Sequence, residues 1–584
     1  MMKKTLKSLL CAILCLALLV PATRIISSGK APLSVFVTAD WHNRPQSMLV
    51  PIQENNNLPG DPLYHHTNSQ GQLTYECGAI YDEMLKIFEA SDSQFMLIAG
   101  DLTDDGYLQE HLTLAARLKS FEQRTGKQIF VINGNHDIRG SVSEKSINLE
   151  QFKNIYSDFG YSQALDVDGQ SASYTAELAG DYRLIAVDSC EEHGKDTGAL
   201  SAQRLAWVKT QADRARADGK RLVCIFHHSL LEHFKNEIVA AGNLLIKDYR
   251  NVASSFADWG IQYVFTGHMH ATDITSAVSG NGNKIYDIET SCLISSPNHY
   301  RRVTFTGDAT KIETFGISRI DTGLLPEGYT PQQLSLIQND FPAYSRGYFK
   351  AGMNKFINDY MGSPGSIARA LGIEKGTPEY LALAAVMNNF GAALNLPLYD
   401  VGHTAAVDSV EEIAAIAGKT LEASGYRHLP ELVGTVLLVH YGGDEKMVFD
   451  SPEIRLFTSA FKAALVYSLV NIPDNLFKTL LQSQGLTVPP GEPAGGSYTA
   501  AAKLLYAGKA VDYFFAAVLK PLILGFIEDS YSPGDLNETF EPYGQTGEPG
   551  SHPAPVNDLA FIADVLRRIL TDFFEAMRLL VIFS

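Results

Sequence analysis

Short apolar runs alternate with longer amphipathic stretches in the first half of the chain. The runs are rich in Val, Ile, Leu and Phe, and most end in polar residues. They cover residues 33–40, 94–101, 128–137, 182–189, 220–228 and 262–270. Helix candidates lie between them at residues 79–90, 108–124, 201–218 and 252–259. Apolar strands that alternate with helices predict an α/β layered fold whose sheets are buried on both faces.

The pattern changes after residue 320. A stretch rich in Pro and Gly comes first, and the remainder is dominated by helical windows at residues 411–423, 459–470 and 499–527. Loops are predicted at residues 486–497 and 531–555. The last segment, 559–580, carries one apolar helix stripe, which favours core packing over docking to a membrane or partner. We expect an α/β domain over residues 31–320, a linker over 321–335 and a mainly α-helical C-terminal domain over 336–584.

The first 30 residues have the composition of an export segment. A short basic start precedes an apolar stretch at residues 9–20, and Pro21-Ala22 follow. The apolar stretch is short for a membrane span, which needs ~20 residues. We therefore expect an exported protein, either secreted or associated with a membrane or the cell envelope through this segment. A cleaved signal peptide and an uncleaved anchor both remain open.

Composition and charge narrow the class further. The chain has 584 residues, which is too long for one ordinary core, and 45% of them are hydrophobic. A formal net charge of -18 argues against binding to a nucleic-acid polymer, because such binding needs a basic face. Beyond the export segment the cysteines are far apart, and we expect buried free thiols at Cys77, Cys190, Cys224 and Cys292.

Polar residues gather where the predicted strands end. Taken singly, each cluster has an ordinary explanation as a cap or a turn, and Asn133-Gly134 is a strong hairpin signal. In α/β folds, however, side chains at the carboxyl ends of strands meet at one place. Imidazole and carboxylate groups suit a pair of divalent ions ~3.5–4 Å apart. The clusters contain Asp40, His42, Asp101, Asn135, His136, Asp137, His227, His228, His268 and His270.

The order of these clusters resembles that of the calcineurin-like metallophosphoesterases. The shared pattern is Asp-x-His, Gly-Asp, Gly-Asn-His-Asp, a strand-end His and Gly-His-x-His, and it covers about residues 33–320. The resemblance implies a β-sandwich flanked by helices, in the layer order αββα. It does not extend to the C-terminal half.

The resemblance also implies a set of metal ligands. Two divalent ions, either Mn, Fe or Zn, would be held by Asp40, His42 and His270 on one side and by Asn135, His227 and His268 on the other. Asp101 would bridge them. His227 is preferred to His228 because it is the first residue after the strand, and His228 is a candidate for substrate binding.

Catalytic roles are implied for His136 and Asp137. A metal-bound hydroxide would attack the phosphorus atom, and His136 would contact the phosphoryl oxygen or protonate the leaving group. We expect Asp137 to fix the tautomer of His136 and to raise its basicity.

Several motifs are most similar to the branch of bacterial cyclic-nucleotide phosphodiesterases and glycerophosphodiesterases. They include "GDLTDDG", "FHHSLLEH" and "TGHMH". This favours a small phosphodiester substrate and a bacterial source. A phosphomonoesterase or nucleotidase would need the same metals and is the alternative. A non-catalytic scaffold is less favoured, because it would have lost ligands and none is lost. Ser229 and Leu230 depart from the Pro found in many relatives, which leaves the substrate, like the oligomeric state, open.

Overall fold

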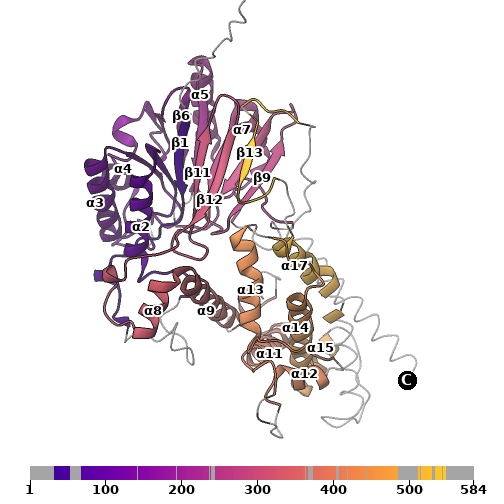
Figure 1. The fold of residues 1–584 in the computed structure, drawn as a ribbon. Helices are drawn as coiled ribbons and strands as arrows, with labels where there is room; N and C mark the ends of the chain where they lie inside the picture. The colour runs from indigo at the N-terminus through magenta and orange to yellow at the C-terminus, as the bar shows by residue number, and fades with distance from the viewer. Residues whose placement is uncertain are drawn as a thin grey trace, which may run out of the picture.

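Two stacked β-sheets with helices on their outer faces form the first part of the molecule, as the computed structural model shows (Figure 1). The structure describes residues 32–52, 68–483 and 511–547, apart from short gaps within these ranges. The predicted export segment and the apolar stripe at 559–580 lie outside the described residues. This layer order agrees with the α/β sandwich that the sequence predicts.

The first sheet has the strand order β13-β12-β11-β1-β2-β3. Its strands are β1 (Leu33–Thr38), β2 (Phe95–Ala99), β3 (Gln128–Ile132), β11 (His299–Phe305), β12 (Thr310–Gly316) and β13 (Glu538–Phe540). Strands β1, β2 and β3 are parallel, with Val37 opposite Leu97 and Leu97 opposite Phe130. Their carboxyl ends therefore reach the same edge of the sheet.

The second sheet has the order β4-β5-β6-β7-β8-β10-β9. Its strands are β4 (Asp166–Val167), β5 (Tyr174–Glu177), β6 (Tyr182–Val187), β7 (Arg221–Phe226), β8 (Ile261–Thr266), β9 (Asp273–Val278) and β10 (Lys284–Glu289). Strands β6, β7, β8 and β10 run parallel to one another. The loops that follow β7 and β8 consequently lie side by side.

Burial on both faces explains the continuous apolar runs. Leu184 and Val223 face the first sheet and join the main core. Their neighbours Ile185 and Cys224 face the opposite way, toward Val208 and Phe256 on two outer helices. Each strand therefore supplies two cores, so both sets of alternating side chains must be apolar.

Four helices of the α/β part lie close to their predicted positions: α2 (Cys77–Ala90), α3 (Leu108–Thr125), α5 (Ala202–Ala217) and α7 (Tyr249–Trp259). Helix α4 (Leu149–Ile155) and the short 3-10 turns η1 (Gln46–Met48) and η3 (Tyr161–Gln163) were not predicted. The Ser201 side chain caps α5 by accepting from the Arg204 N–H, and Gly126 ends α3 in the left-handed conformation.

A helical region follows, beyond one end of the sheets (Figure 1). It contains η4 (Thr322–Leu324), α8 (Pro331–Asn339), α9 (Phe341–Met361), α11 (Pro378–Leu394), α12 (Val410–Ile416), α13 (Leu429–Gly442), α14 (Pro452–Val470), α15 (Asp474–Ser483), the π-helical turn η5 (Phe515–Leu519) and α17 (Lys520–Ile527). Ile337, Phe341 and Tyr344 belong to the same hydrophobic cluster as Val35 of the first sheet and Leu184 of the second. The helical region therefore shares a core with the sandwich.

Three local differences from the sequence predictions have simple causes. Residues 531–555 were expected to be loop, yet Glu538–Phe540 form β13, which pairs antiparallel with β12. Helix α8 starts at Pro331, inside the predicted linker, because Thr330 caps it. Helix α12 ends at Ile416, whereas the helical window ran to residue 423.

Two further expectations concern thiols and membranes. All four described cysteines are free and buried, which confirms the prediction. Within the described residues, none of the helices combines the length and the apolar character that crossing a membrane requires.

Candidate metal centre

The loops after β1, β2, β3, β7 and β8 meet at one edge of the two sheets and bring the predicted ligands together. Backbone hydrogen bonds fasten the first two loops: Asp40 N–H donates to the Gly100 carbonyl (3.1 Å) and His42 N–H to the Asp101 carbonyl (2.9 Å). The Gly267 N–H donates to the His227 carbonyl at 3.0 Å and fastens the last two. The strand ends of both sheets thus form one site.

Five of the predicted ligands have left-handed backbone. The φ angles are 53° at Asp40, 42° at His42, 46° at Asp101, 74° at His268 and 63° at His270. Such a conformation costs about 1–3 kcal/mol at a residue with a side chain, and it concentrates at functional sites. Among the described residues, only Asp248 and Asn298 share it outside glycine. Most of the described non-glycine residues with left-handed backbone therefore lie at the candidate site.

Asp101 divides the site into two halves. Its Oδ2 lies 3.8 Å from His42 Nε2, and its Oδ1 lies 3.4 Å from His227 Nε2. The side chain is almost fully buried, so neither oxygen is directed into bulk water. A carboxylate with one oxygen toward each half has the arrangement of a bridging ligand.

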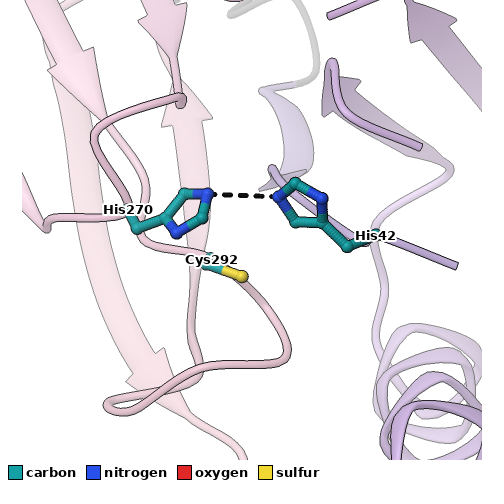
Figure 2. Close-up of side chains that lie close together, drawn as sticks. All are labelled: His42, His270 and Cys292. Atoms are coloured by element: carbon teal, nitrogen blue, oxygen red, sulfur yellow. Dashed lines mark hydrogen bonds between the residues drawn. The ribbon is translucent and has the colours of Figure 1, made fainter. Parts of the chain in front are cut away.

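The first half contains three more donors. His42 Nε2 and His270 Nε2 face each other at 3.1 Å, as Figure 2 shows. Asp40 Oδ1 lies 3.6 Å from His270 Nε2 and 3.9 Å from His42 Nε2. Cys292 is next to this group (Figure 2), and its thiol donates to the Asp40 carbonyl at 3.1 Å. These distances agree with donor atoms that share one cation.

The second half is formed by Asn135, His227 and His268. Asn135 Oδ1 lies 3.0 Å from His227 Nε2. His227 donates from its other nitrogen, Nδ1, to the Ala99 carbonyl at 2.9 Å. His268 Nε2 donates to the Asp196 carbonyl at 3.1 Å, which leaves its Nδ1 as an acceptor. In a metal-bound histidine, one ring nitrogen usually donates to a carbonyl or carboxylate group and the other ligates the metal.

Gly134 and Gly267 have no side chains, which leaves room for two of the predicted ligands. A β-carbon at Gly134 would overlap the Asp101 carboxylate, and one at Gly267 would overlap the Asp40 carboxylate. Neither glycine needs an unusual φ angle. Their presence in the motifs is explained by close packing against the carboxylates.

Burial and charge set the protonation of the site. Burial raises the pKa of Asp40 to about 8 and lowers the pKa of His42 and of His268 well below the usual range. Burial also disfavours charge on His227, but the Asp101 carboxylate outweighs it and raises the pKa of His227 to about 9. An imidazole must be neutral to ligate a metal. The negative charge of Asp101, which favours a proton on His227, would equally attract a metal cation bound beside it.

The donor set fits two divalent cations. His42 and His270 gather on one side, and Asp101, His227 and His268 form a group whose donor atoms all lie within 4.8 Å of one another. Imidazole nitrogen with carboxylate and amide oxygen suits Mn, Fe or Zn. The residues present are therefore able to hold a dinuclear centre.

His136 lies at the edge of the centre. Its Nδ1 donates to the Asp104 carbonyl, and its Nε2 lies 4.0 Å from Asp101 Oδ2. About 21% of its side chain is exposed, so Nε2 can reach a molecule that enters from solvent. Burial alone would lower the pKa of His136, but Asp101 and the Asp104 carbonyl raise it above the ordinary value.

The expectation for Asp137 was wrong in its mechanism. Its carboxylate accepts from the N–H groups of Leu102 (3.1 Å), Thr103 (2.9 Å) and Gly134 (2.8 Å) and from the Thr103 hydroxyl (2.8 Å). It therefore joins the loops after β2 and β3, and the Asp104 carbonyl orients His136 instead. Adjacent residues on a turn point in different directions, which the sequence does not reveal.

His228 packs against His268, with ring centroids 4.3 Å apart, and both of its ring nitrogens bond protein groups. Its Nδ1 lies 2.7 Å from the Ser189 hydroxyl and its Nε2 donates to the Asp196 carbonyl at 3.1 Å. Burial and the nearby His227 lower its pKa to about 3. Both nitrogens are engaged and the side chain is buried, so this geometry does not support the expected contact with substrate.

Sequence reasoning missed Asp104 and Asp196. Asp104 bonds His136 and Asp196 bonds His268 through a backbone carbonyl, and the Asp196 carboxylate also accepts from the Asn135 amide at 3.4 Å. A carbonyl is present at every position, so no residue type could have marked the two carbonyl contacts.

Comparisons with known proteins agree with this site. Residues 33–272 match the family described as Calcineurin-like phosphoesterase, so this part of the chain is a calcineurin-like metallophosphoesterase domain. A curated "Probable cyclic nucleotide phosphodiesterase" of Rhodococcus erythropolis is 21% identical over 229 residues. The match covers 39% of this chain and 66% of the relative, slightly less than two thirds of its length. The family implies a metal-dependent hydrolase.

Solved structures show more distant similarity. A dimetal phosphatase from Danio rerio covers 49% of this chain and 96% of its own, at 11% identity and a TM-score of 0.34. A purple acid phosphatase from yellow lupin covers 49% and 52%, at 11% identity and a TM-score of 0.33. An NAD nucleotidase of Haemophilus influenzae covers 66% and 68%, at 13% identity and a TM-score of 0.30.

Proposed function

We propose that the protein hydrolyses small phosphodiesters with the help of two divalent metal ions. The observation that carries the proposal is the placement of Asp101, whose two carboxylate oxygens face two separate groups of donors. One group comprises Asp40, His42 and His270, and the other Asn135, His227 and His268. Two bound dications would polarise the phosphoryl group and lower the pKa of water near the phosphorus atom.

The chain itself orients these ligands and excludes water. Carbonyl contacts fix the rings of His227 and His268, so their free nitrogens already point inward before a metal or substrate arrives. Asp40, Asp101 and His227 are almost completely buried. Electrostatic interactions in this region are therefore stronger than at the surface.

His136 is assigned to the leaving group. With Nδ1 donating to the Asp104 carbonyl, its Nε2 faces the partly exposed edge of the site. The raised pKa favours the imidazolium, which has a proton on Nε2 to give to a departing alkoxide. General acid catalysis of this kind contributes typically 10²–10⁴-fold.

The choice of a diester rests on the sequence motifs and on the curated relative. That relative carries the description of a probable cyclic nucleotide phosphodiesterase. A small diester such as a cyclic nucleotide or a glycerophosphodiester is therefore the proposed substrate class. The N-terminal segment, residues 1–30, supports the further proposal of export, which mass spectrometry of the protein in culture medium and membrane fractions would test.

The test compares bis-p-nitrophenyl phosphate with p-nitrophenyl phosphate, with Mn²⁺ added. The wild type should hydrolyse the diester faster, and Asp101→Asn should lose at least about 100-fold in kcat because an amide cannot bridge two cations as a carboxylate does. The matched control is Asp213→Asn on the surface of α5, which makes the same exchange far from the site and should leave activity unchanged.

Two outcomes would count against the proposal. Equal activity of wild type and Asp101→Asn would remove the dinuclear assignment. Faster hydrolysis of the monoester would replace the diesterase with a phosphomonoesterase that uses the same centre.

A further inference from the structure

Two buried acidic residues lie behind the metal centre on strand β10. Asp287 and Glu289 are separated by two positions, so their side chains point to the same face of the strand. Both are fully buried. Burying two carboxyl groups costs free energy unless each is hydrogen-bonded and its charge is balanced. Their bonding partners therefore indicate their role.

Glu289 contacts the two loops that carry the strand-end histidines. Its Oε1 accepts from the Ala271 N–H at 3.3 Å, and its Oε2 accepts from the Ser229 hydroxyl at 3.3 Å. Ala271 directly follows His270, and Ser229 follows the His227-His228 pair. One carboxyl group therefore connects ligand loops that start from different strands.

Asp287 contacts the same two loops slightly farther from the ligands. Its Oδ2 accepts from the N–H groups of Leu230 (2.6 Å) and Leu231 (2.9 Å). Its Oδ1 accepts from the Thr266 hydroxyl at 2.6 Å. Thr266 is the last residue of β8, two positions before His268.

The His233 ring lies among three buried carboxyl groups. Its Nε2 lies 3.3 Å from Asp287 Oδ2 and 3.4 Å from Glu289 Oε2, and its Nδ1 lies 3.2 Å from Asp273 Oδ1. Burial disfavours the imidazolium, but the three carboxyl groups outweigh it and raise the pKa of His233 well above the usual range. Burial also raises the pKa of Glu289 well above its usual range, although the nearby His233 opposes this shift.

We infer that Asp287 and Glu289 are positioning residues that hold the ligand loops after β7 and β8 in register. They accept hydrogen bonds from backbone and hydroxyl groups beside His227, His268 and His270. The inference rests on the proposed metal-dependent function. It predicts that disturbing this pair weakens metal binding before it unfolds the protein.

The experiment titrates the metal-free full-length chain with Mn²⁺ by isothermal calorimetry. Glu289→Gln should weaken Mn²⁺ binding about 10- to 100-fold, as loss of a partner behind metal ligands commonly does. Ser229→Ala, which removes a single hydrogen bond, should weaken it about 2- to 10-fold. Glu232→Gln is the matched control, because Glu232 is buried on the same loop yet bonds Tyr249 and Arg250. Its Mn²⁺ affinity should equal that of the wild type.

The outcomes separate the inference from the function on which it rests. Circular dichroism shows whether each variant is folded, and Ser229→Ala decides the matter should Glu289→Gln unfold. Unchanged Mn²⁺ affinity in folded Glu289→Gln or Ser229→Ala overturns the inference while leaving the metal centre intact. An equal loss in Glu232→Gln overturns it too, since the effect would then be one of general stability. A wild type that binds no Mn²⁺ would refute the proposed function and the inference together.

Discussion

Backbone carbonyls decide what each histidine of the centre can do. His227 donates to Ala99, His268 to Asp196 and His136 to Asp104. In every case the ring nitrogen on the other side is left to face the site. His228 differs because protein groups occupy both of its nitrogens. His227 and His228 are neighbours in the sequence, yet only His227 has a ring nitrogen directed at the metal site.

The assignment of His136 predicts a dependence on the leaving group. His136→Ala should lower kcat about 10²–10⁴-fold for an alkyl phosphodiester, which needs a proton on departure. The loss should be much smaller for bis-p-nitrophenyl phosphate, because p-nitrophenolate leaves without protonation. Steady-state kinetics on the two substrates provides the check, and Mn²⁺ content should stay at the wild-type level. An equal loss on both substrates would move His136 from acid to phosphoryl-oxygen ligand.

Asp137 is predicted to act on stability. Asp137→Asn keeps its shape but gives up acceptor capacity among four buried donors, so the free energy of unfolding should fall by about 3 kcal/mol. The apparent pKa values of the rate profile should not move, because the side chain does not contact His136. Urea unfolding and a pH–rate profile test the two parts. A shifted profile with unchanged stability would restore the role expected from sequence.

Polar residues at strand ends, and the family resemblance that they carry, allowed the gathering of Asp40, Asp101 and the histidines at one edge of the sheets to be predicted. The directions of Asp137 and His228 could not be predicted. They depend on turn geometry and on partners such as Thr103 and Ser189 that are distant in sequence.

At the scale of elements, helix α13 is in direct contact with the loop that carries His270. The Thr272 N–H donates to the Tyr441 carbonyl at 3.2 Å, and Gly443 ends the helix in the left-handed conformation with φ 64°. A β-carbon at Gly443 would overlap the Thr272 carbonyl. The helical region therefore limits the position of a ligand loop.

Gly443→Ala is predicted to disturb that loop. The left-handed alanine costs about 1–2 kcal/mol, and the displaced Thr272 should also weaken Mn²⁺ binding severalfold. Gly126→Ala at the end of α3 is the matched control, because it has φ 71° and nothing within 4 Å of an added β-carbon. It should lose similar stability with no change in Mn²⁺ affinity. The same Mn²⁺ affinity in both variants would show that α13 does not position the site.

The long elements could be predicted from periodicity, as α3 and α5 show. Strand β13 could not, because three residues carry no usable period and their pairing with β12 joins segments more than 200 positions apart. The contact of α13 with Thr272 escaped prediction because it joins residues that are far apart in the sequence.

Over the whole molecule, the chain returns to the sandwich after the helical region. Strand β13 extends the first sheet, and Tyr543 packs against Tyr263 with a ring separation of 5.0 Å. The Tyr543 hydroxyl donates to the Leu222 carbonyl at 2.8 Å. With α8 and α9 contributing to the main core, the two parts are joined at both ends of the helical region.

This joining predicts one cooperative unfolding transition. Tryptophan fluorescence reports on the α/β part, since Trp41, Trp207 and Trp259 all lie there, whereas far-ultraviolet circular dichroism also reports on the helices. The two midpoints should coincide. Tyr543→Ala should lower both equally, by about 3 kcal/mol of unfolding free energy. Separate midpoints, or a shift in fluorescence alone, would mean that the parts unfold independently.

The proposed dinuclear centre requires the Asp101 carboxylate to bridge two metal cations. Electron paramagnetic resonance of the Mn²⁺-loaded chain tests it most directly, because a bridged pair gives an exchange-coupled spectrum. The wild type should bind two Mn²⁺ per chain and show that coupled spectrum, and Asp101→Asn should lose the coupling. A wild-type spectrum of isolated Mn²⁺ only, at one ion per chain, would contradict the dinuclear centre.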